Sequence, residues 1–116
     1  MEKKVSHKYE HLFQQMRDLS AKIDRTYEIY RKLAPKNGEI PVGGAHIDEW
    51  VKIETMEAVL RGMRQEKEKE EIVEAAKGAY IAVIERWNAK REYQVHRSTC
   101  GADMFVQNVI KKVGLV

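Results

Sequence analysis

A repeating apolar pattern in the first third of the chain constrains its fold more than any other feature. Apolar side chains recur there at alternating steps of three and four, with one polar member, Thr26. This spacing is a heptad seam, which is typical of a helix packed lengthwise on another helix. The apolar members of the seam are Tyr9, Leu12, Met16, Leu19, Ile23, Tyr30 and Leu33.

A straight helix from Val5 to Leu33 would be about 45 Å long at ~1.5 Å per residue, which is long for a chain of 116 residues. Such a helix must lie against another long helix, either in the same chain or in a second copy. Because a second copy is one of the two options, the seam residues are also predicted as an oligomer interface.

The remaining segments follow from proline, glycine and the return of apolar residues. Pro35 ends the first segment, because proline disfavours helical geometry in the residue before it. We expect a heptad helix over residues 1–34 and a loop over 35–45, where both prolines lie. Residues 46–95 should form the helical hairpin partner of the first helix, and residues 96–116 a short C-terminal helix.

The run from Arg64 to Glu71, RQEKEKEE, has no apolar residue. It is either a solvated stretch of one continuous helix, with charge pairs at three- and four-residue spacing, or the exposed connection between two helices. Good helix formers without Gly or Pro favour the continuous helix. No stretch shows strand alternation, so the sequence predicts a single all-α domain in which the heptad helix packs on one or two further long helices.

Charge is unevenly distributed along the chain, whose formal net charge is +3. Residues 1–34 carry +3, residues 35–85 carry −4 and residues 86–116 carry +4. A basic end after an acidic middle is typical of proteins with a polyanion partner. The chain has a single cysteine, and no apolar run approaches the ~20 residues that span a bilayer. We therefore expect a cytoplasmic protein without membrane contact.

No constellation of residues in the sequence indicates catalysis. The glutamates from Glu66 to Glu74 have no matching acidic pair on a following helix, which an all-α magnesium-dependent pyrophosphohydrolase would need. The Gly43–Gly44 pair follows no strand and precedes no phosphate-loop lysine. We therefore expect no enzyme activity, no metal site and no cofactor.

The segment with the most informative motif is the C-terminal end, VHRSTCGADMFVQNVIKKVGLV. It resembles the last part of a helix-turn-helix in phage late transcription regulators of the RinA and ArpU type, which are related in style to the DNA-binding end of sigma factors. Val95–Thr99 would be the turn, Cys100–Val113 the recognition helix and Gly114–Leu115 its close. The long helices and the glycine-containing loop fit the same outline.

The resemblance implies a phage-derived DNA-binding transcriptional regulator that acts as a helical dimer and contacts a host protein such as RNA polymerase. It also implies roles for particular side chains: basic ones on phosphates, hydroxyls as helix caps, and amides as base readers. These are, in that order, Arg91, Arg97, Lys111 and Lys112; Ser98 and Thr99; Gln107 and Asn108.

The heptad helix also supports a second interpretation, in which nucleic acid plays no part. The protein would then be a non-catalytic interaction or assembly protein, an adaptor or an inhibitor that docks through this helix. Its basic C-terminal end would be ordinary solvated surface. Salt separates the two interpretations, because DNA binding falls steeply with added salt and apolar docking does not.

Overall fold

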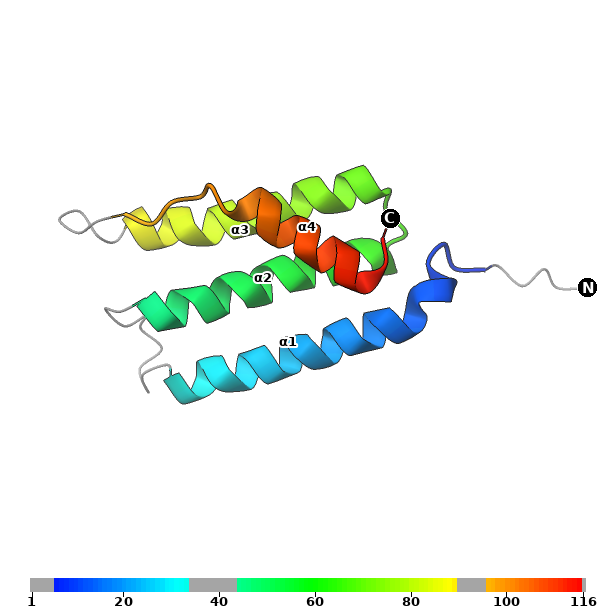
Figure 1. The fold of residues 1–116 in the computed structure, drawn as a ribbon, viewed down its shortest axis with the longest axis horizontal. Helices are drawn as coiled ribbons and strands as arrows, with labels where there is room; N and C mark the ends of the chain where they lie inside the picture. The colour runs from blue at the N-terminus through cyan, green and yellow to red at the C-terminus, as the bar shows by residue number, and fades with distance from the viewer. Residues whose placement is uncertain (1–5, 34–43, 90–95, 116) are drawn as a thin grey trace, which may run out of the picture.

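The computed structural model describes residues 6–33, 44–89 and 96–115 (Figure 1). Within these ranges the chain forms a short 3₁₀ helix, four α-helices and no strand, so the all-α prediction is confirmed. The elements are η1 (Glu10–Leu12), α1 (Phe13–Leu33), α2 (Gly44–Arg64), α3 (Lys69–Ala89) and α4 (Ala102–Val113).

The three long helices form one layer, and the short helix crosses it (Figure 1). In this layer α2 lies between α1 and α3 and runs antiparallel to both, so α1 and α3 point in the same direction. Helix α4 contacts all three from one side. We call this side the α4 face and the opposite side of the layer the open face.

The heptad seam of α1 faces the core of its own chain. Its side chains from Tyr9 to Ile23 join one buried cluster with apolar residues of α2, α3 and α4. Thr26, the polar member, is also buried, and its hydroxyl donates to the Lys22 carbonyl at 2.8 Å. That local bond satisfies the hydroxyl, which explains why a polar residue is tolerated in the seam.

The burial of the seam corrects the oligomer interface predicted there. Tyr30 is half-buried, with its ring centroid 5.1 Å from that of Trp50, and the Leu33 side chain lies outside the described residues. A second copy or another protein could reach the seam between Tyr9 and Ile23 only if the fold opened. The other five predicted interface residues are at most 7 % exposed within one chain: Tyr9, Leu12, Met16, Leu19 and Ile23.

The first helix begins later than the heptad pattern predicts. Residues 6–9 are not helical, η1 follows them, and α1 starts at Phe13. The predicted start at Val5 lies outside the described residues. The apolar spacing continues through this segment because Tyr9 and Leu12 still point into the core, although the backbone is no longer α-helical.

The chain before η1 is held by the connection between α2 and α3. The Lys8 amide donates to the Glu66 carboxylate at 2.6 Å, and the Lys8 ammonium pairs with Glu68. The Tyr9 hydroxyl donates to the Lys67 carbonyl at 2.5 Å. These contacts join segments nearly sixty residues apart and hold the chain before η1 against the connection between α2 and α3.

The continuous helix favoured by the sequence is wrong, because the chain reverses over residues 65–68. Helix α2 ends in a Schellman motif, in which the Lys67 amide donates to the Gly62 carbonyl at 2.9 Å and the Glu66 amide to the Met63 carbonyl at 3.0 Å. Glu66 has a φ of +56°, a left-handed conformation that glycine usually supplies. Because glutamate replaces the usual glycine here, the sequence carries no signal for the end of α2.

The structure corrects the predicted start of α4 and confirms its end. Neither of the two hydroxyl residues caps the helix: its N-cap is Gly101, and the Ser98 hydroxyl accepts from the Cys100 amide at 3.0 Å. At the other end Gly114 adopts a left-handed φ of +85°, as a glycine stop requires.

Two glycines offer a matched test of how closely α2 and α3 pack. A Cβ on Gly62 would lie 2.7 Å from Cγ1 of the buried Ile72, whereas one on Gly78 would meet no atom within 4 Å. We expect Gly62→Ala to lower the free energy of unfolding by about 1–3 kcal/mol through overpacking. Gly78→Ala should raise it by up to about 1 kcal/mol, since alanine has the higher helix propensity. Urea unfolding measures both, and equal stabilities would contradict the close packing.

Candidate anion-binding surface on α1 and α4

Helix α4 has one apolar and one polar side. Asn108, Lys111 and Lys112 are exposed, and their spacing of three and four residues places them on one side of the helix. This side is therefore available to a partner while the helix stays docked. The buried side consists of Ala102, Val106, Val109, Ile110 and Val113.

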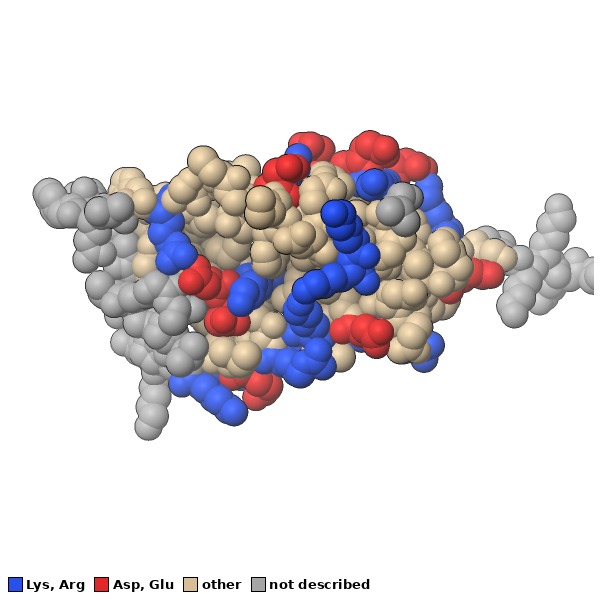
Figure 2. All heavy atoms as spheres, viewed as in Figure 1, with Lys and Arg blue, Asp and Glu red and all other residues tan. Residues whose placement is uncertain are grey.

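Helix α1 brings further cations to the same place. Its Lys22 and Arg25 lie with Lys112 around a cavity of about 210 Å³ whose floor includes Leu19 and Met56. Figure 2 shows Lys and Arg side chains running as a band across this face, from α4 toward α1. We call these four residues the basic band: Lys22, Arg25, Lys111 and Lys112.

The basic band holds like charges against one another. The Lys112 ammonium, within hydrogen-bond reach, lowers the pKa of Lys22, and partial burial and the charges of Lys52 and Arg25 lower this pKa further. In the described part of the chain, no carboxylate lies within 4 Å of the charged nitrogens of the band. A bound anion would relieve this repulsion.

Acidic side chains border the band without neutralising it. Asp18 lines the same cavity, and its carboxylate accepts a hydrogen bond from the Gln14 amide at 3.0 Å. Lys52, at the margin, pairs with Glu49 at 3.5 Å. The positive charge is therefore confined to a strip across α1 and α4.

Arg97, a predicted phosphate-contacting residue, is held by α2 and α3. The Arg97 guanidinium pairs with Asp48, and the Arg97 amide donates to Asn88 Oδ1 at 2.9 Å. Arg97 thus fastens the chain before α4 to α2 and α3, away from the basic band. Arg91 lies outside the described residues. Lys111 and Lys112 are exposed on α4, and their contact with phosphates stays a prediction.

Thr99 and Gln107, two further residues of the predicted DNA-binding set, have local partners. The half-buried Thr99 accepts a hydrogen bond on its carbonyl from the Ala102 amide at 3.2 Å. Lys77, 2.9 Å from Asp103, lowers the pKa of that carboxyl group, and a hydrogen bond from Gln107 adds a smaller part. The first turn of α4 therefore carries an ionised aspartate, which is unfavourable next to DNA phosphates.

The described part of the segment before α4, residues 96–101, is not helical. A helix-turn-helix joins its two helices by a turn of about three or four residues, which is shorter than this stretch. The predicted turn starts at Val95, which lies outside the described residues, and its described part, residues 96–99, does not lead directly into α4. Helix α4 packs on all three long helices.

The sequence prediction omits Lys22 and Arg25. Both lie on the heptad helix, and the sequence does not indicate which side of that helix meets α4. The excess of positive charge in residues 1–34 was the signal available, but it does not single out these two residues.

No protein family, curated protein or solved structure matches this chain. The resemblance to phage regulators therefore rests on the C-terminal motif alone and stays a prediction. None of the described helices is long and apolar enough to cross a membrane.

Proposed function

We propose that this protein is a non-catalytic DNA-binding protein that contacts the phosphate backbone through the basic band. The observation that carries the proposal is the position of Lys22 against Lys112 beside Arg25. Three cations from two helices meet there, and the described residues place no carboxylate within 4 Å of their charged nitrogens. Such repulsion disfavours folding, whereas a bound polyanion would relieve it and attract each of the three cations.

An extended polyanion fits the band better than a small anion does. Lys111 continues the band along the exposed side of α4, beyond the cavity that Lys22 shares with Lys112. Double-stranded DNA carries one negative charge per ~1.7 Å of its axis, so one duplex can contact several of these side chains at once. Asn108, one turn away, could then bond a phosphate or a base edge, as the transcription-regulator prediction requires.

Salt dependence tests the proposal through the lysines of α4. With four phosphate contacts, the logarithm of the affinity should fall with the logarithm of salt at a slope of about −3.6. Fluorescence anisotropy of a labelled mixed-sequence duplex at ~50 and ~200 mM salt should therefore show a loss of about two orders of magnitude. Lys111→Ala with Lys112→Ala should reduce the slope by about 1.8 and leave the fold intact, because both side chains are exposed.

A matched control is Lys67→Ala with Arg86→Ala, which removes two exposed charges outside the band. This variant should keep the slope of the original protein. Absence of binding at the lower salt would refute the proposed function. An unchanged slope in the α4 variant would remove those two lysines from the interface.

A further inference from the structure

The open face of the layer carries a continuous series of hollows. A groove of about 750 Å³ between α1 and α2 and a neighbouring hollow of about 310 Å³ share Ser20, Asp24 and Arg64. The second hollow shares Arg61 with a depression of about 380 Å³ between α2 and α3. No residue of α4 lines any of the three.

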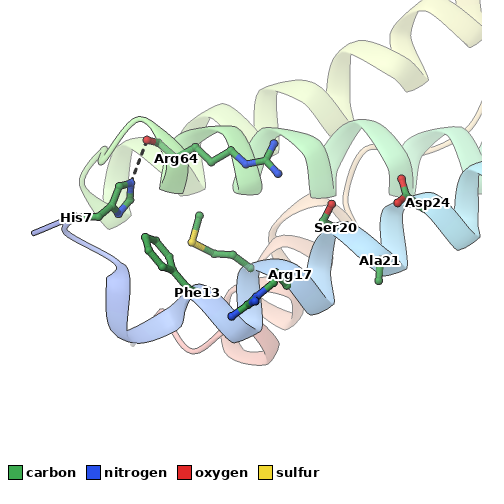
Figure 3. A pocket seen from close by; sticks show the side chains of 8 residues that line it. His7, Phe13, Arg17, Ser20, Ala21, Asp24 and Arg64 are labelled. Carbon is green, nitrogen blue, oxygen red and sulfur yellow. Dashed lines mark hydrogen bonds between the residues drawn. The ribbon is translucent and has the colours of Figure 1, made fainter.

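Arg17 of α1 and Arg64 of α2 line the groove between these two helices (Figure 3). Phe13, which is 42 % exposed, lines the same groove, and Arg61 lies in the neighbouring hollow. None of the three arginines has a described carboxylate within 4 Å of its guanidinium. The carboxylates that line the two hollows are Asp24 and Glu57. The groove is therefore cationic overall and has an exposed apolar anchor.

The exposed side of α3 that borders the open face carries negative charge, which complements the cationic groove. Glu71 near its start is exposed and has no cation within 4 Å among the described residues. Glu71 lines the depression on the open face. The side chains that follow it on this helix are small and at least partly exposed, which lets another helix approach closely: Ala75, Gly78, Ala79 and Ala82.

We propose that a second copy of this chain docks on the open face, with the start of its α3 in the arginine-lined groove. Because α1 and α3 run in the same direction (Figure 1), a two-fold axis parallel to the helices brings α3 of one copy over α1 of the other. The axis also keeps the ends aligned. Arg17 near the start of α1, Arg64 at the end of α2 and Glu71 near the start of α3 all lie at one end of the layer. Arginines therefore meet glutamates twice, once on each side of the axis.

The open face is large enough for such a dimer. Each layer helix has 21 residues and is about 32 Å long at ~1.5 Å per residue. Three helices spaced ~9 Å apart are about 25 Å wide, so the face covers roughly 800 Å². A stable interface buries about this area on each partner. The dimer leaves α4 and the basic band of each copy exposed.

Sedimentation velocity on the full chain tests the dimer. At ~50 mM salt the protein should change from monomer to dimer between about 1 and 100 µM, and added salt should weaken the dimer. Arg17→Glu with Arg64→Glu places glutamate against glutamate and should give a monomer. Glu71→Arg places arginine against arginine and should do the same. An equimolar mixture of the two variants should recover the dimer, because opposite charges then meet on both sides of the axis.

Three outcomes would overturn the dimer: a wild-type monomer at about 100 µM, a dimer that survives both charge reversals, or a mixture that stays monomeric. Recovery in the mixture also shows that both variants are folded, and circular dichroism checks each alone. Lys111→Glu with Lys112→Glu is the control on the α4 face. It should lose DNA binding and keep the dimer, so failure of the dimer and failure of the proposed function are distinguishable.

Discussion

Val106→Asp is expected to unfold the chain, because it places a carboxylate where α4 meets the long helices. Val106 is 0 % exposed and belongs to the cluster that joins all four helices. The substitution removes a buried apolar side chain and leaves a charge without a partner, so it should cost more than about 4 kcal/mol of unfolding free energy. That loss approaches the whole stability of a small domain, which is about 5–15 kcal/mol. Circular dichroism during thermal unfolding measures it.

The same helix provides a control of matched chemistry. Met104 is 72 % exposed, so Met104→Asp also converts an apolar side chain of α4 to aspartate, but in solvent. The unfolding free energy should stay within about 0.5 kcal/mol of the original. If both variants kept the original melting temperature, α4 would not be part of the core.

Lys22→Glu with Arg25→Glu is expected to weaken DNA binding by at least about 100-fold at ~50 mM salt. The substitutions remove two phosphate contacts and place two negative charges beside Lys111 and Lys112. Folding should be preserved or slightly favoured, because Lys22 then faces Lys112 with the opposite charge instead of a like one. Anisotropy titration with the labelled duplex gives the affinity, and circular dichroism gives the stability.

Net charge alone could weaken DNA binding, so the location of the change must be tested separately. Lys67→Glu with Arg86→Glu changes the net charge equally at exposed positions outside the band. Its affinity should stay within about threefold of the original at ~150 mM salt, where charges more than ~8 Å away are largely screened. Equal losses in the two variants, both measured at ~150 mM salt, would contradict a localised site.

The sequence predicts the apolar pattern of this fold well and its chain reversal poorly. The heptad spacing identifies the buried side of α1 as far as Ile23 and Thr26, because core burial follows directly from side-chain periodicity. The same spacing does not reveal whose helix covers that side. The answer depends on the turn at residues 65–68, which makes α2 and α3 two neighbouring helices in the same chain.

That turn escapes prediction for a physical reason. Glu66 occupies a left-handed position without the glycine that usually marks one, and its local cost is offset by contacts from the distant N-terminal segment. Lys8 bonds the Glu66 carboxylate through its amide and Glu68 through its ammonium, and the Tyr9 hydroxyl bonds the Lys67 carbonyl. No local sequence rule includes partners so far apart in the chain.

The basic band also contains residues that the sequence names and residues that only the structure brings in. The C-terminal motif resemblance names Lys111 and Lys112, and both are exposed on α4, while their contact with phosphates stays a prediction. Lys22 and Arg25 lie beside Lys112 only because α4 packs on α1. Arg97, which the sequence prediction includes, is instead paired with Asp48. Tertiary contacts therefore determine which cations share a surface.

The most direct test of the basic band is to map the DNA contact on the folded protein. Amide nitrogen–proton spectra of the labelled chain, titrated with an unlabelled duplex at ~50 mM salt, report the perturbed residues one by one. We expect the perturbations to cluster at Lys22 and Arg25 of α1 and at Asn108, Lys111 and Lys112 of α4. The open face, including Arg17 and Arg64, should stay unperturbed. Perturbations confined to the open face, or none at all at millimolar duplex, would contradict DNA binding through the basic band.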